Sequence, residues 1–300
     1  MTQPPHDGTP RVRDVVLDAD GLPLSGLLAE PRHALPRAVV VALHGGGMRA
    51  GYFHGQAHPS LSLLTLGAQL GYTVLALDRP GYGASEHRLP KGMVLTDQSQ
   101  RLHTALTCFA AQHPIGAGFF LLAHSYGGKL ALTMAADEYG SGLIGLDVSG
   151  LGHRYAVDVE EFAGFDARRS RHLHWGPLRL YPPGTFRLAA PLVTPMPERE
   201  VHEAPRWPAV FPGVAARARV PMRFTFAEYE RWWRHDDATV SAMRRLLAAP
   251  MTVVDRLPHA GHNVSLGWAA RSYHLRALGF LEECLLAHEW RQKSLSPGAA

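Results

Sequence analysis

Short apolar runs that end in glycine recur through the first half of the chain and limit the fold more than any other feature. They are AVVVALHGGG, YTVLALDRPGYG, GFFLLAHSYGG and GLIGLDVSG. Each has the length of a strand and is apolar at successive positions, which is typical of strands covered on both faces. Stretches with helical spacing lie between the runs. This alternation predicts an α/β fold with a mostly parallel, doubly wound sheet and helices on both faces.

The alternation breaks between residues 151 and 219, where many prolines stand among aromatic and arginine side chains. A long proline-rich segment without clear periodicity is usually a lid or a disordered insertion, and its aromatic residues favour an ordered lid. Strand-like and helix-like stretches resume after it. We therefore predict a core of residues 1–150 and 220–290, a cap or lid at 151–219 and a flexible tail at 291–300.

Composition and charge exclude several classes of protein. The chain has 300 residues, and 46% of them are hydrophobic, which is enough for a sizeable core. The formal net charge is +4, but Lys and Arg form no dense block, so we predict no nucleic-acid partner. No stretch reaches the length of a membrane span, and the polar N-terminus has no apolar signal-peptide region. Two cysteines far apart, Cys108 and Cys284, predict a reducing, cytoplasmic location.

Ser125 is the first candidate functional residue. It lies in AHSYG, where small residues, Ala123 and Gly127, stand two positions away on either side. A buried strand leads in and a helix leads out, which is the setting of a nucleophile elbow. The N–H groups of that helix, beginning with Tyr126, face any oxyanion that forms beside the serine. The alternative is an ordinary serine that caps the helix.

The glycines that follow the first buried strand supply further candidate donors. His44 is followed by Gly45, Gly46 and Gly47, and a backbone without side chains can approach a substrate closely. We assign the backbone N–H groups of Gly46 and Gly47 to an oxyanion hole, together with Tyr126. A phosphate cradle is the alternative, although the spacing matches neither G-x-G-x-x-G nor a Walker loop.

These motifs resemble those of the α/β-hydrolase superfamily, over roughly residues 11–290. LDRPGYGAS resembles the family's loop after the next strand, and LPHAGHNVSLGW resembles its histidine loop. The resemblance implies the α/β-hydrolase fold, with the cap inserted after the strand that follows the nucleophile helix. It also implies a triad in the chain order nucleophile, acid and histidine, with no cofactor.

The resemblance places the base at His262, which follows Gly261 and precedes the final helix. His259 is a rival only three residues away. His172 and His174 alternate in RHLHW, but without a nearby pair of carboxylates they predict no metal site.

The acid is placed at Glu230 by aligning VPMRFTFAEYE with the end of the family's strand before the last one. A glutamate departs from the commoner aspartate there and reaches one methylene further. Four rivals stay open: Glu228, Asp236, Asp237 and, after the earlier strand, Asp147. Otherwise these rivals are solvated carboxylates, or, for Asp147, a structural group at a strand end.

The cap of such an enzyme shapes the substrate pocket, and we assign His44, His124, Trp175 and Trp207 to it. The resemblance implies a serine hydrolase that cleaves a carboxylic ester or thioester through an acyl-enzyme intermediate. The same triad also serves C–C bond hydrolysis, acyl transfer or cyclisation of a small metabolite. A non-catalytic binding protein ranks last, because all three triad positions are filled. The predicted partner is a small-molecule substrate, with a carrier-bound acyl group as one option, and the oligomeric state stays open.

Overall fold

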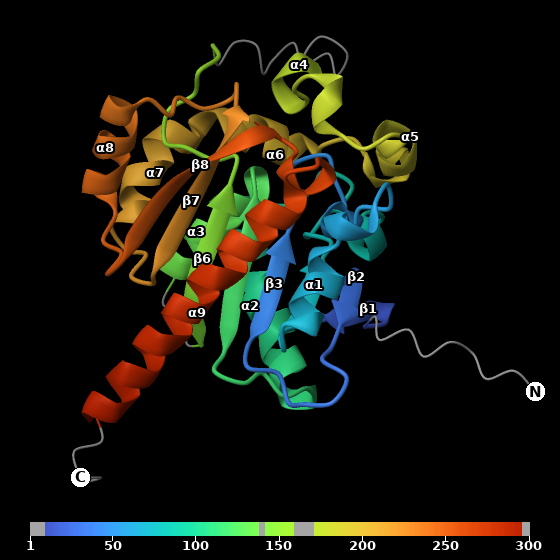
Figure 1. The fold of residues 1–300 in the computed structure, drawn as a ribbon, viewed down its shortest axis with the longest axis vertical. Helices are drawn as coiled ribbons and strands as arrows, with labels where there is room; N and C mark the ends of the chain where they lie inside the picture. Colours follow the sequence, from blue (N-terminus) through green and yellow to red (C-terminus); the bar gives the residue numbers. More distant parts are fainter. Residues whose placement is uncertain (1–9, 138–141, 159–170, 296–300) are drawn as a thin grey trace, which may run out of the picture.

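The computed structural model describes residues 10–137, 142–158 and 171–295, and these residues form one sheet with helices on both faces (Figure 1). The strand order is β1-β2-β4-β3-β5-β6-β7-β8. β1 and β2 pair antiparallel, as do β2 and β4, whereas every pair from β4 to β8 is parallel. The strands are β1 (Val12–Asp18), β2 (Pro23–Ala29), β3 (Val39–Leu43), β4 (Thr73–Leu77), β5 (Phe119–His124), β6 (Leu143–Ser149), β7 (Met222–Tyr229) and β8 (Thr252–Gly261). The predicted mostly parallel sheet is confirmed.

Helices connect the parallel strands and cover the sheet. The α-helices are α1 (Leu63–Gln69), α2 (Leu95–Gln112), α3 (Tyr126–Ala136), α4 (Arg171–His174), α5 (Thr185–Ala189), α6 (Glu198–Glu203), α7 (Trp207–Ala215), α8 (Asp237–Leu246) and α9 (Ala270–Leu295). Short 3-10 helices are η1 (Ala50–Phe53), η2 (Pro59–Leu61), η3 (Gly83–Ser85), η5 (Leu178–Leu180), η6 (Ala190–Leu192), η7 (Ala204–Arg206) and η8 (Val264–Leu266).

The continuous apolar runs are explained by two cores, one on each face of the sheet. In β3, Val39, Val41 and Leu43 face the core formed with α2, α3 and α7. Val40 and Ala42 face the other core, which includes side chains of α1 and α9. Since successive side chains of a strand point to opposite faces, a strand covered on both sides must be apolar at every position.

The connection between β6 and β7 holds the segment in which the alternation breaks. Its described part contains α4 to α7, and α4 and α5 lie at the end toward which the parallel strands point (Figure 1). α7 packs into the core, where Trp207 and Phe211 are buried. Residues 159–170 of this segment lie outside the described residues.

The predicted tail at 291–300 is wrong in its first part. α9 continues to Leu295, so the final helix is longer than expected, and residues 296–300 lie outside the described residues. Among the helices in the described ranges, none combines the length and the apolar character needed to cross a membrane.

Candidate active site

Ser125 occupies a strained backbone position between β5 and α3. Its φ is 52° and its ψ is −116°, in a region that residues other than glycine rarely adopt. The Ser125 N–H donates to the carbonyl oxygen of Ser149 at 2.8 Å, and the Ser125 carbonyl accepts from the Gly128 N–H at 2.9 Å. The strain and these bonds match the nucleophile elbow that the sequence predicts. The side chain makes no capping bond to the helix, so the alternative of an ordinary N-cap serine is not supported.

The glycine after Ser125 is required by close packing of two chain segments. A Cβ at Gly127 would lie 2.3 Å from the Leu43 carbonyl oxygen and 2.6 Å from that of His44. Such contacts are too short for any side chain, so only glycine lets the start of α3 sit against the end of β3. This packing brings the elbow and the glycine loop together.

His262 and Glu230 form a buried pair at the carboxyl ends of β8 and β7. The Nδ1 of His262 lies 2.8 Å from Oε2 of Glu230, and both side chains are almost completely buried. Because a carboxylate only accepts, Nδ1 carries the proton and Nε2 keeps its lone pair. The other carboxylate oxygen of Glu230, Oε1, accepts the N–H of Trp232 at 2.9 Å, which holds the carboxylate in place.

The pair lies beside the elbow. The ring of His262 is 4.7 Å from the ring of His124, the residue that precedes Ser125. A Cβ at Gly150 would lie 2.8 Å from the His262 ring, so glycine makes room for it. Within the described residues no hydrogen bond joins Ser125 Oγ to His262, and such bonds often tighten only when substrate binds.

Asp147, the rival acid inside the sheet, is engaged elsewhere. Its side chain is buried, and its carboxylate oxygens accept from Arg223 and, at 2.8 Å, from the hydroxyl of Tyr273. Arg223 also donates to Asp255 at 2.7 Å. These contacts tie β6, β7, β8 and α9 together, and none of them involves a histidine.

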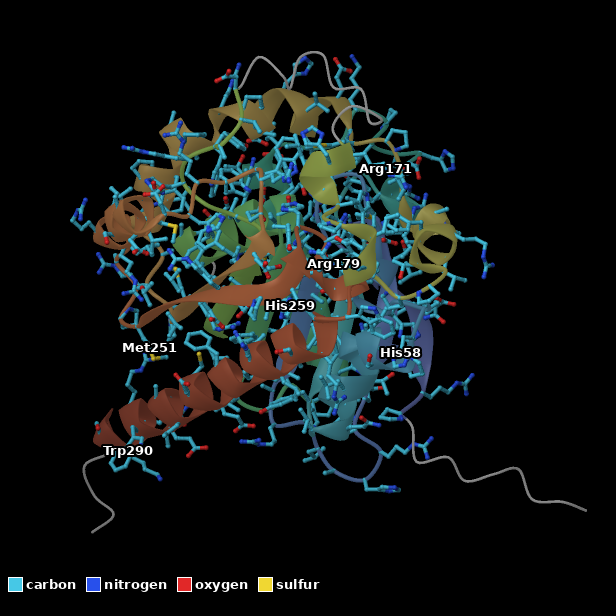
Figure 2. The ribbon with its side chains drawn as sticks, turned by 45° about the horizontal axis from the view of Figure 1, so that its top comes forward. His58, Arg171, Arg179, Met251, His259 and Trp290 are labelled. Carbon is cyan, nitrogen blue, oxygen red and sulfur yellow. The ribbon has the colours of Figure 1, made fainter. Side chains whose placement is uncertain are left out.

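The other rivals lie at the surface or at a helix end. His259 is 86% exposed, on the face of the molecule seen in Figure 2, and its backbone N–H donates to Glu228 at 2.6 Å. Asp236 caps α8 by accepting the Thr239 N–H at 2.9 Å, and Asp237 pairs with Arg256 in solvent. Of the two sets of candidates, Glu230 and His262 form a buried pair, whereas Glu228 and His259 meet at the surface.

The predicted oxyanion donors are not equivalent, and the structure corrects the assignment of the Gly47 N–H. The Gly47 N–H donates to the Tyr82 hydroxyl at 3.1 Å, so it is not available to a substrate. Gly46 lines the cavity beside Ser125, and a Cβ there would lie 2.9 Å from Met196 Sδ. Among the residues that the structure describes, no acceptor takes the N–H of Gly46 or of Tyr126. These two amides remain the candidate donors.

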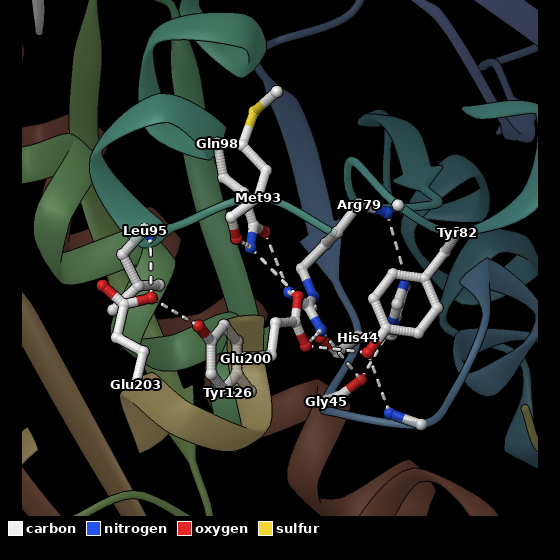
Figure 3. Close-up of polar contacts among 12 residues, drawn as sticks. His44, Gly45, Arg79, Tyr82, Met93, Leu95, Gln98, Tyr126, Glu200 and Glu203 are labelled. Carbon is white, nitrogen blue, oxygen red and sulfur yellow. Dashed lines mark hydrogen bonds and ion pairs between the residues drawn. The ribbon is translucent and has the colours of Figure 1, made fainter. Parts of the chain in front are cut away.

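A buried polar network holds the glycine loop (Figure 3). Arg79, which follows β4, donates from Nε to the His44 carbonyl at 2.9 Å and forms a fully buried ion pair with Glu200 of α6. Glu200 also accepts the Tyr82 hydroxyl at 2.8 Å, and that hydroxyl in turn holds Gly47. The loop is thus positioned by a residue from the connection between β6 and β7.

A cavity of about 90 Å³ opens onto Ser125. It is mostly apolar and is lined by Gly46, Ser125, Tyr126, Lys129, Tyr155, His174, Met196, Val201, Ala204, Trp232 and Trp233. One end lies near His262, since the ring of His174 is 5.9 Å from that of His262. Burial lowers the pKa of His174 to about 3, so this wall is uncharged at neutral pH.

Comparison with known proteins agrees with this geometry. The sequence model described as the alpha/beta hydrolase family matches residues 40–271. The chain belongs to the alpha/beta hydrolase family. Among curated proteins, no sequence matches this hydrolase significantly.

Solved structures share the fold of this hydrolase at low identity. A thermostable carboxyl esterase from Bacillus coagulans is 15% identical with a TM-score of 0.67, and the match covers 91% of this chain and 99% of the esterase. A monoglyceride lipase from Saccharomyces cerevisiae is 15% identical with a TM-score of 0.66, covering 93% and 96%. The 2-hydroxy-6-oxo-6-phenylhexa-2,4-dienoate hydrolase from Rhodococcus is 16% identical with a TM-score of 0.62, covering 90% and 100%.

The two histidines assigned to the pocket of the hydrolase do not line this cavity. His44 is buried under the glycine loop, where its Nε2 accepts the Arg79 N–H at 3.0 Å, and burial lowers its pKa well below the usual value. His124 is stacked on Tyr52 at 4.8 Å and lies 3.1 Å from the Ser149 hydroxyl through Nδ1. Both assignments are wrong, because each ring packs against other buried groups and does not line the cavity.

The two tryptophans assigned to the pocket are also elsewhere. Trp207 is buried in the core, and its Nε1–H donates to the Gly152 carbonyl at 3.0 Å. Trp175 packs against Tyr181 and Phe186 in an aromatic cluster. The tryptophans that line the cavity of the hydrolase are Trp232 and Trp233, two and three positions after Glu230.

The sequence patterns did not predict that Lys129 lines the cavity. One signal was present: Lys129 is the only charged residue of the apolar helix YGGKLALTMAA and lies four positions after Ser125. Positions i and i+4 share a helix face, so the lysine belongs on the face of the elbow. In the described ranges, no cluster of three or more potential metal ligands includes His172 or His174.

Proposed function

We propose that this chain is a serine hydrolase of small carboxylic esters or thioesters, with Ser125 as nucleophile, His262 as base and Glu230 as acid. The observation that carries the proposal is the buried bond of 2.8 Å between His262 and Glu230 beside a serine in a strained elbow. A serine hydroxyl is a poor nucleophile without an adjacent base, and the base in turn needs a fixed tautomer. Glu230 fixes this tautomer by accepting the Nδ1–H of His262.

The chemistry proceeds in two halves. The Ser125 oxygen attacks the carbonyl carbon while its proton passes to Nε2 of His262, and Glu230 stabilises the imidazolium. His262 then protonates the leaving alcohol or thiol as its bond to the carbonyl carbon breaks, which leaves an acyl-enzyme. Water attacks the acyl group with His262 as base, which releases the carboxylic acid and restores the serine.

Two backbone amides are suited to the oxyanion. Gly46 and Tyr126 present N–H groups from the glycine loop and from the first turn of α3, and the positive end of the α3 dipole adds to them. The buried Arg79–Glu200 pair supports this arrangement because it fixes the loop that carries Gly46.

The cavity supports a small, largely apolar acyl group. A carrier-bound acyl thioester stays within the proposal, because a thioester reaches Ser125 by the same chemistry. We also propose a cytoplasmic location, supported by the free thiols of Cys108 and Cys284, the two cysteines of the chain.

Covalent labelling tests the proposal. A fluorophosphonate should modify Ser125 in the native chain and leave Ser125→Ala unlabelled, with peptide mass spectrometry locating the adduct. A panel of short- and long-chain p-nitrophenyl esters and acyl-thioesters should then show turnover, with a preference for short acyl chains. An adduct on a different serine would refute the assignment. Labelling without turnover of any ester or thioester would instead favour C–C hydrolysis or acyl transfer by the same triad.

A further inference from the structure

Lys129 is a buried lysine inside the cavity that opens onto Ser125. It lies on α3 one turn after the elbow, is 3% exposed and forms part of the cavity wall. Four residues of helix span about 6 Å along the axis. The amine is therefore within the reach of a small molecule whose carbonyl group sits at Ser125.

The surroundings of the amine resemble an aromatic cage. Its Nζ lies 5.3 to 5.8 Å from the ring centres of four aromatic side chains, which are Tyr126, Tyr155, Trp207 and Trp233. Ring faces attract a cation. The amine also donates to the Tyr155 hydroxyl at 2.8 Å and to the Ala204 carbonyl at 3.0 Å. An ammonium group has three donors, so one remains for a further acceptor.

The charge of Lys129 has no close carboxylate in the described part of the chain, where no ion pair within 4.0 Å includes it. The two nearby glutamates are engaged by other groups: Glu203 accepts from Tyr126 and from the Leu95 N–H, and Glu200 pairs with Arg79. An ammonium buried without a counter-ion is costly. Burial accordingly lowers the pKa of Lys129 to about 7.

We propose that Lys129 binds a carboxylate carried by the acyl part of the substrate, so that the enzyme prefers esters or thioesters of short dicarboxylic acids. This inference rests on the proposed function. The carboxylate supplies the missing counter-charge and takes the third N–H of the amine, while the apolar walls hold the intervening methylene groups. Such a charge-assisted bond in a water-poor site is stronger than a neutral one.

The acyl side is favoured over the leaving group by the positions of the catalytic groups. The leaving group must lie beside His262, which protonates it, and the cavity wall there is formed by His174. Lys129 instead lies on the helix whose first N–H, that of Tyr126, is a proposed oxyanion donor.

The experiment compares two esters of nearly the same size, monoethyl glutarate and ethyl valerate, by pH-stat. At pH 6.5 we expect kcat/KM to be roughly ten- to hundred-fold higher for the glutarate ester, the range of one charge-assisted hydrogen bond. Turnover of the neutral ester with no preference for the acidic one overturns this inference and leaves the hydrolase proposal intact. If neither of these two esters and no ester of the panel above is turned over, the proposed function is overturned, and this inference falls with it.

The preference should also depend on pH. Raising the pH through the pKa of about 7 removes the positive charge of Lys129, so the ratio of the two kcat/KM values should fall between pH 6 and 8.5. Both esters use the same proposed catalytic groups, so effects common to the two esters cancel in the ratio. Glu203, Glu200 and Arg79 act on the amine through their charges, while burial keeps the hydroxyls of Tyr126 and Tyr155 neutral by raising their pKa values. A ratio independent of pH contradicts the proposal, and this arm needs no variant.

Lys129→Met provides the second arm, because it removes the amine and keeps most of the length and the apolar character of the stem. The ratio should fall by roughly ten-fold or more toward that of a neutral cavity. Lys293→Met is the matched control: Lys293 is exposed near the end of α9, beside Trp290 and away from the cavity, so its ratio should match the native one. An unchanged ratio in folded Lys129→Met would mean that Lys129 only anchors Ala204 and Tyr155.

Discussion

Two buried carboxylates belong to neighbouring strands of the sheet, one within β6 and one just after β7, and their partners give them opposite roles. Glu230 follows the end of β7 and binds His262, whose imidazole has two nitrogens that can each carry a proton. Asp147 lies within β6 and binds Arg223, which stays charged at all ordinary pH values. The first pair is able to move protons beside Ser125, whereas the second can only hold strands together. Burial of a carboxylate therefore does not identify the acid of a site; the partner does.

Removing the base should have the largest effect. His262→Ala leaves Ser125 without a proton acceptor, and kcat on an activated ester should fall by about 10⁶-fold, as with other triads. Ser125→Ala should cost about the same, because the two groups act as a unit. Steady-state kinetics with circular dichroism as the folding control measures both. A loss in Ser125→Ala far greater than in His262→Ala would place the base elsewhere.

Changing the acid should cost less. Glu230→Gln keeps the size of the side chain but presents an amide, which can favour the wrong tautomer of His262, so kcat should fall on the order of 10³–10⁴-fold. The unfolding midpoint in urea reports whether the buried amide also costs stability. If kcat stays within a few-fold of the native value, the His262–Glu230 bond is structural, and the contrast between the two pairs disappears.

Asp147→Asn should show the reverse pattern. It removes one of two carboxylates from a buried Arg223, and breaking such a pair typically costs about 3–5 kcal/mol of unfolding free energy. Because Asp255 still pairs with Arg223, we expect about 3 kcal/mol, measured by urea denaturation. The kcat of the folded fraction should stay near native. A loss of kcat as large as that of Glu230→Gln would return Asp147 to candidacy as the acid.

The smallest effect is expected at the surface rivals. His259→Ala removes an exposed ring, and Glu228→Gln alters a half-exposed carboxylate that accepts the His259 backbone N–H and lies near the His259 ring. Surface changes usually shift stability by no more than about 0.5 kcal/mol, and kcat should change by less than about two-fold. Parallel assays with His262→Ala provide the comparison. Equal losses at His259 and His262 would leave the choice of base unsupported.

Local sequence patterns predicted the parts of the site that depend on the backbone. Ser125 could be found because an elbow needs a strand, a strained turn, a helix and small neighbours, all of which are adjacent in the chain. His262 and Glu230 could be placed because the family pattern ties them to the ends of β8 and β7. Strand ends meet at one edge of a parallel sheet, so a residue assigned to the right strand end arrives near the site.

The four pocket residues could not be predicted in this way. Nothing in the local sequence distinguishes Trp207 from Trp232. Tertiary packing decides that Trp207 lies in the core and that Trp232 lines the cavity. In the sequence, Gly47 is equivalent to Gly46. In the structure, the Gly47 N–H donates to the hydroxyl of Tyr82, which is 35 positions away in the chain.

The sequence by itself determined the sheet, the strained turn at Ser125 and the strand ends that carry the proposed base and acid, because apolar periodicity and turn chemistry act between near neighbours. Only the tertiary structure decided which amide is free, which aromatic rings line the cavity and that Lys129 is buried among four of them. Those properties depend on atoms brought together from α3, from the loops after β3, β4 and β7, and from the connection between β6 and β7. A hydrogen bond or a desolvated charge is defined by its partners in space, and the order of residues does not record them.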